Sequence, residues 1–155
     1  MTLKEKLNRI KDSEGLPGFE VFGLPETITS IHRLQKSFNL VLPNDYREIL
    51  EEYGQASLFG EGITLTFFSI DEILGGQLHD INNSLRNVFP IGTDDSGQYY
   101  FYDIKNNSGF GNNSIGLIDP GNLEWKYVVV LGGNLSEVVD RIITGEDFQE
   151  YDMIG

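Results

Sequence analysis

Three stretches near the start of the chain space their apolar residues three and four positions apart, which predicts amphipathic helices. The first follows a capping box formed by Thr2 and Glu5. The second begins near Thr27, and the third extends from Asn44, as its N-cap, to Gly54, a residue suited to ending a helix. The predicted inward positions are Leu3, Leu7 and Ile10 in the first stretch, Ile28, Ile31, Leu34 and Phe38 in the second, and Tyr46, Ile49, Leu50 and Tyr53 in the third. The first third of the chain is therefore predicted to be helical.

The spacing of apolar residues changes to two in the middle of the chain, as expected for strands. Residues 63–67 alternate in this way, and Ser69 with Glu72 then matches a capping box that opens a short helix. Residues 89–92 and 98–103 read as two strands joined by a tight Asp/Gly turn. This part of the chain therefore predicts antiparallel pairing.

The last part of the chain predicts another hairpin and a closing helix. Residues 115–118 and 123–131 flank an Asp-Pro-Gly-Asn turn, and the apolar run 128–131 favours a strand buried on both faces. The closing helix extends from Asn134 to Gly145. This order indicates an α+β fold, a single domain with N-terminal helices and a C-terminal helix packed on a mainly antiparallel sheet.

Charge restricts the class of partner. The chain has 155 residues, with 11 Lys and Arg against 24 Asp and Glu, and a formal charge of -13. Because nucleic-acid binding needs a basic surface, this balance argues against a nucleic-acid partner, and it disfavours an anionic membrane surface too. There is no cysteine, no apolar signal core at the N-terminus and no apolar run near the roughly 18 residues of a membrane span. We expect a soluble, cytoplasmic protein.

The acidic residues are unevenly distributed. Between Glu48 and Asp103 there are ten acidic residues and a single basic one, Arg86. One interpretation is a solvated surface that keeps the protein soluble; the other is an acidic face that meets a basic partner. Charge alone leaves both interpretations open.

Patterns for catalysis are absent, and no catalytic, cofactor-binding or metal-binding residue is predicted. The two histidines, His32 and His79, are interpreted as helix or surface residues. Asp94 and Asp95, with Asp103, suggest a cation site, but their spacing does not fit a calcium loop. A hairpin turn explains them without a metal, because Asp side chains accept hydrogen bonds from turn amides.

Four consecutive aromatic residues occupy one predicted strand. Tyr99 and Phe101 face one side of it, and Tyr100 and Tyr102 face the other. One pair is expected in the core, while the other is either covered or exposed. An exposed tyrosine pair with an acidic rim is typical of a protein-binding hot spot, although the core is favoured for both pairs.

Two segments resemble landmarks of the SUKH superfamily. Residues 42–54, LPNDYREILEEYG, resemble its "LPxDYxxxL…G" signature, and residues 89–99, FPIGTDDSGQY, resemble its "PIGxDxxG" strand–turn–strand. With the closing helix, the resemblance covers about residues 25–145, which are expected to be the core of one domain spanning 1–155, followed by an acidic tail at 146–155. It implies an α+β fold in which the first signature supplies fold residues: Leu42, Pro43, Tyr46, Leu50 and Gly54.

The resemblance also implies a function by binding. Bacterial members are typically immunity proteins that neutralise a co-encoded toxin, often a nuclease, and a fungal branch acts in the regulation of cell-wall synthesis and signalling. We expect a non-enzymatic immunity protein whose acidic surface binds a basic toxin domain; the alternatives are a regulatory interaction scaffold and a small acid/base or metal-dependent enzyme. The expected partner-binding residues are Glu51, Glu61, Asp71, Glu72, Asp80, Asp94, Asp95, Tyr100, Tyr102 and Asp103.

Overall fold

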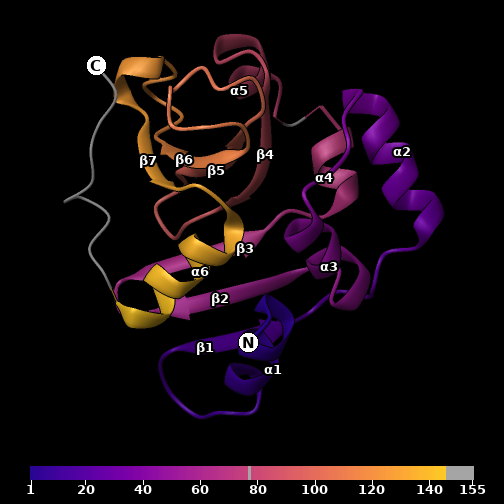
Figure 1. The fold of residues 1–155 in the computed structure, drawn as a ribbon, viewed down its shortest axis with the longest axis vertical. Helices are drawn as coiled ribbons and strands as arrows, with labels where there is room; N and C mark the ends of the chain where they lie inside the picture. The colour runs from indigo at the N-terminus through magenta and orange to yellow at the C-terminus, as the bar shows by residue number, and fades with distance from the viewer. Residues whose placement is uncertain (77, 146–155) are drawn as a thin grey trace.

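A computed structural model describes residues 1–76 and 78–145. The strands in these residues form one antiparallel sheet whose spatial order follows the chain order (Figure 1). The strands are β1 (Gly18–Val21), β2 (Ala56–Gly60), β3 (Ile63–Phe67), β4 (Val88–Thr93), β5 (Tyr99–Asp103), β6 (Ser114–Ile118) and β7 (Val129–Gly132). Among the described strands, β1 and β7 are therefore the two edges, and β5 lies inside the sheet.

Helices precede, interrupt and follow the strands. They are α1 (Leu3–Lys11), α2 (Ile28–Phe38), α3 (Asn44–Glu52), α4 (Ile70–Leu74), α5 (His79–Ser84), the 3₁₀ helix η1 (Trp125–Tyr127) and α6 (Leu135–Thr144). Both predicted capping boxes are present, at Thr2 with Glu5 and at Ser69 with Glu72. The predicted α+β fold is confirmed: N-terminal helices and a C-terminal helix pack on an antiparallel sheet.

One face of the sheet is covered by α3 and α6. Figure 1 shows α6 lying across the sheet beside α3, and α6 contacts β2, β6 and β7. At the centre, Tyr46 of α3 is fully buried against three aromatic rings, at centroid distances of 6.4 Å to Phe67, 5.7 Å to Phe89 and 6.0 Å to Tyr102. The signature residue Tyr46 thus docks the helix layer on the sheet.

The opposite face of β5 and β6 is covered as well. Phe101 of β5 packs edge-to-face against Trp125 of η1, with ring centroids 5.9 Å apart. Gly116 of β6 permits this close packing, because a Cβ there would lie 2.7 Å from the Phe101 ring and 2.9 Å from Val128. The inner strand β5 is therefore buried on both faces.

Several local predictions are wrong. Ile28 is 70% exposed at the start of α2, although the helical spacing placed it inward. Pro43, rather than Asn44, is the N-cap residue of α3, and its start has no capping hydrogen bond from a side chain in the described part of the chain. In the run 128–131, Val129 and Val130 are only partly buried, because the edge strand β7 has a neighbour on one side only.

Other elements were not predicted. β1 interrupts the first third of the chain, which the sequence predicts to be helical, and β2 and α5 were not recognised. The predicted acidic tail, residues 146–155, lies outside the described residues. Among the residues that the structure does describe, no helix has both the length and the apolar character needed to cross a membrane.

Candidate functional site

The ten residues expected at a partner surface differ widely in exposure. Five of them are exposed: Glu51, Glu61, Asp71, Asp80 and Asp95. Glu72 and Asp94 are partly buried, and Tyr100, Tyr102 and Asp103 are buried. The candidate surface therefore has to be built from acidic side chains without the tyrosines.

The possibility of an exposed Tyr100 and Tyr102 pair is ruled out. Tyr100 is 0% exposed and donates its hydroxyl hydrogen bond to the carbonyl oxygen of Thr64 over 2.9 Å. Tyr102 is 1% exposed and packs against Tyr46 in the core. Burial raises the pKa of both tyrosines well above the ordinary value, and nearby carboxylates, Asp94 among them, add to the shift of Tyr100. The inner position of β5 is the physical reason, since both of its faces are covered.

Asp103 fixes the loop that follows β5. It is 1% exposed, and its two carboxylate oxygens accept backbone N–H groups of Asn107 at 2.9 Å and Ser108 at 2.8 Å. These charge-assisted hydrogen bonds hold the loop that follows β5 against the end of the strand. The expectation that Asp103 belongs to an accessible binding surface is therefore wrong.

Asp94 builds the turn between β4 and β5. Its Oδ1 accepts the backbone N–H groups of Ser96 at 2.9 Å and Gln98 at 2.8 Å, and its Oδ2 accepts the Gln98 side-chain amide at 2.9 Å. Gly97 adopts a φ of +89°, a conformation that glycine accepts without strain. The hairpin-turn interpretation is confirmed, and within the described ranges no group of three potential metal ligands is found.

A pocket of about 330 Å³ lies where this turn meets the hairpin between β2 and β3. Asp94 and Asp95 line it together with Gly62 and Ile63, and the buried Tyr100 contributes to its wall. Asp95 is exposed, and its Oδ2 accepts the Thr64 hydroxyl over 3.0 Å. We call this cavity the acidic pocket.

Glu61 adjoins the acidic pocket along the chain but is not among its lining residues. It immediately precedes Gly62, a lining residue, and its side chain is exposed. The tertiary structure thus brings Glu61, Asp94 and Asp95 to one region, although more than 30 residues separate Glu61 from the other two in sequence. None of the ion pairs found among the described residues involves these three carboxylates.

The remaining acidic residues lie elsewhere and several already have partners. Glu51 pairs with Arg47 within α3, at 3.4 Å, and Asp71 pairs with Arg33 of α2, also at 3.4 Å. Glu72 closes the capping box of α4 and accepts the side-chain amide of Gln55 at 3.2 Å. Asp80 lies on α5. The sequence interval from 48 to 103 therefore does not form one continuous acidic patch.

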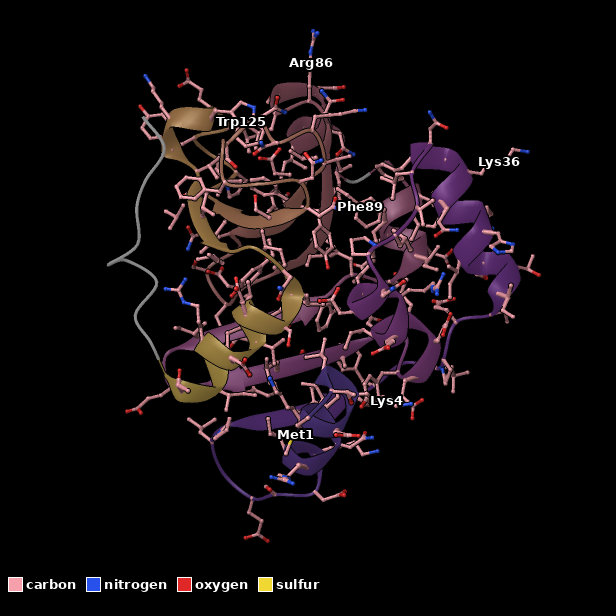
Figure 2. All side chains as sticks on the ribbon, in the orientation of Figure 1. Met1, Lys4, Lys36, Arg86, Phe89 and Trp125 are labelled. Atoms are coloured by element: carbon pink, nitrogen blue, oxygen red, sulfur yellow. The ribbon has the colours of Figure 1, made fainter. Side chains whose placement is uncertain are left out.

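Basic side chains lie on several elements, and four of the eleven Lys and Arg residues are on α1. Figure 2 shows Lys4, Lys36 and Arg86 pointing outward from different parts of the surface, whereas Phe89 points into the interior. No Lys or Arg is found among the described residues that line the acidic pocket. An unneutralised negative surface is therefore available there.

A family model for SMI1 / KNR4 family (SUKH-1) matches residues 25–141. The chain belongs to the SMI1/KNR4 family. This confirms the resemblance to the SUKH superfamily that the two motifs indicated. A search of curated proteins finds no match.

The SMI1/KNR4 match includes the residues that build the acidic pocket. Both of its turns, and the β6 and β7 residues Leu117 and Val129 of its wall, lie between residues 25 and 141. Sequence reasoning found the acidic residues of this site but missed Ile63, Leu117 and Val129 as lining residues. No local signal could have found them, because the pocket forms only when distant strands pair.

Proposed function

We propose that this SMI1/KNR4-family protein is a non-enzymatic immunity protein that binds a co-encoded toxin in the cytoplasm and neutralises it. We propose that this toxin is a nuclease with a basic substrate cleft. Family membership supports the class of function, and the exposed acidic region around Glu61, Asp94 and Asp95 is the observation that carries the proposal.

The physical argument is electrostatic complementarity. A nuclease must hold phosphates, so its cleft carries Lys and Arg. A protein with a formal charge of -13 is attracted to such a cleft over several ångströms, and complementary charge raises the association rate and fixes the orientation of docking. Covering the cleft blocks the toxin without any chemical step by the immunity protein.

Co-expression tests this proposal directly. The gene is expressed together with the toxin gene encoded beside it, and the expected result is restored growth and co-purification of the two proteins at equal stoichiometry. The association rate of the purified pair should fall about tenfold or more between low and physiological salt, because steered association is screened. Growth arrest despite full expression of the folded protein would refute the proposal.

A regulatory interaction scaffold is the second candidate, because the resemblance to the SUKH superfamily also implies a fungal branch that acts in the regulation of cell-wall synthesis and signalling. This candidate predicts that deletion of the gene causes a phenotype in a strain that lacks any adjacent toxin. The immunity proposal predicts no phenotype in that strain. The same deletion therefore separates the two functions.

A further inference from the structure

The acidic pocket combines two kinds of wall. One side is apolar and comes from three strands: Ile63 of β3, Leu117 of β6 and Val129 of β7. The other side is the polar turn that contains Asp94 and Asp95. Apolar walls with a few fixed polar groups are characteristic of ligand pockets, and about 330 Å³ lies near the lower end of their usual range of roughly 300–1,000 Å³. The space is therefore sized for one side chain or a fragment.

The polar wall is rigid. The carboxylate of Asp94 accepts hydrogen bonds from the turn amides, which fix its position next to the cavity. Asp95 is held through Oδ2 by the Thr64 hydroxyl, and its Oδ1 accepts no hydrogen bond from the described residues. One carboxylate oxygen at the mouth of the pocket is thus free to accept a hydrogen bond from a ligand.

The apolar wall and the carboxylates of the acidic pocket favour one chemical class of ligand. A ligand that fits needs an aliphatic stem to lie along Ile63, Leu117 and Val129, and a cationic donor at its end to meet Asp95. Long basic side chains combine these parts, since they bury their methylene stems while the charged head contacts polar groups. An acidic ligand is disfavoured, because Glu61, Asp94 and Asp95 are all negative and no Lys or Arg lines the cavity.

We infer that the acidic pocket receives a single arginine or lysine side chain of the partner protein, with its stem against the apolar wall and its charged group hydrogen-bonded to Asp95. This inference rests on the proposed function and assigns one anchor point in the toxin interface. A buried basic anchor in a small pocket is the type of contact that dominates binding energy at protein interfaces.

The test uses model compounds of matched shape. The full-length ¹⁵N-labelled protein is titrated with N-acetyl-arginine methylamide and with N-acetyl-citrulline methylamide, which has nearly the same shape but no charge. The expected result is that the arginine compound shifts the amide signals of Thr64, Ser96 and Gln98 and binds about fivefold more tightly than the citrulline compound, as for a partly exposed charge-assisted contact. Equal binding of the two compounds, or shifts confined to other parts of the protein, would overturn the inference.

Two variants and a matched control locate the contact. Asp95→Asn keeps an acceptor for Thr64 but removes the charge, so the preference for arginine over citrulline should disappear. Asp80→Asn removes the same charge from an exposed position on α5 and should leave the preference unchanged. Val129→Phe narrows the pocket at an edge strand and should weaken both compounds. If Asp80→Asn abolishes the preference as completely as Asp95→Asn, net charge rather than the pocket is responsible and the inference fails.

The outcome is separable from that of the proposed function. Successful toxin neutralisation without any arginine preference would overturn the pocket inference and leave the proposed function in place. Arginine binding in the pocket without neutralisation of the adjacent toxin would refute the proposed function, while it would support the cation specificity of the pocket.

Discussion

The same substitution, tyrosine to phenylalanine, should have opposite effects at two buried positions. The Tyr100 hydroxyl donates to the Thr64 carbonyl oxygen over 2.9 Å. The Tyr46 hydroxyl is equally buried, but it has no hydrogen-bond partner among the described residues. Because both side chains are 0% exposed, each substitution removes one buried oxygen and leaves the aromatic ring in place.

Whether the tyrosine hydroxyl has a hydrogen-bond partner decides the sign and the magnitude of the change in the free energy of unfolding. Tyr100→Phe removes a bond with a net contribution of about 1 kcal/mol and takes a donor from a buried carbonyl, so the free energy of unfolding should fall by about 1–3 kcal/mol. Tyr46→Phe removes a buried hydroxyl that has no hydrogen-bond partner among the described residues to offset its loss of hydration, so the free energy of unfolding should rise by about 1 kcal/mol. The two variants should therefore differ by at least about 2 kcal/mol, which corresponds to a difference of about 4–8 °C in Tm for a domain of this size.

Urea unfolding at pH 7, followed by far-ultraviolet circular dichroism, measures this difference, and thermal unfolding provides the second reading. Equal slopes of the unfolding free energy against urea would show that the two variants unfold from comparably compact states. A Tyr46→Phe variant that loses as much stability as Tyr100→Phe would refute the reasoning, because it would mean that the Tyr46 hydroxyl has a partner of comparable value.

Three further outcomes are expected. Asp103→Asn should lower the free energy of unfolding by about 1–2 kcal/mol, since an amide oxygen cannot replace both carboxylate acceptors for the loop amides, and thermal unfolding measures this loss. Gly60→Ala should lower the free energy of unfolding by about 1–3 kcal/mol, because the new Cβ would lie 2.4 Å from the carbonyl oxygen of Ile142 in α6. Urea unfolding measures this loss, and Glu61→Ala, at the exposed neighbouring position, serves as the control. Burial, with the charge of Glu52, raises the pKa of Tyr53 to about 12, so the folded protein keeps a proton that the unfolded chain loses near pH 10. Tyr53 should consequently leave stability unaffected below pH 10 and lower it between pH 10 and 12. Urea midpoints measured across this range should fall less steeply in Tyr53→Phe than in the unchanged protein. An equally steep fall in both would contradict the assigned role of Tyr53.

The caps of α1, α4 and α6 were predictable because the groups that form them are neighbours in sequence. The capping boxes at Thr2 and Ser69, the Asn134 cap and the left-handed Gly145 all depend on residues within one helical turn, and each is present. The β4–β5 turn was predictable for the same reason, since Asp94 accepts the amides of its own turn. The resemblance to the family also rested on such continuous segments, and the family match confirms it.

The faces of the strands were not predictable from alternation alone. The pattern correctly separated Tyr99 and Phe101 from Tyr100 and Tyr102, but it could not say whether either side was open. That depends on η1, which covers Phe101, and on α3, which covers Tyr102. Likewise, only the pairing of β3 with β4 places Thr64 beside Asp95.

The sequence by itself thus determined the class of fold, the caps of α1, α4 and α6, the β4–β5 turn, the family and the large negative charge. Tertiary structure alone decided which carboxylates remain accessible to a partner. Asp103 is buried and accepts hydrogen bonds from the loop that follows β5, and Asp71 pairs with Arg33. Glu61 and Asp95 are exposed, and Asp95 lines the acidic pocket. The physical reason is the separation along the chain of the residues that interact. Capping and periodicity act over a few residues along the chain, but solvent access and charge pairing depend on which distant segments the sheet brings together.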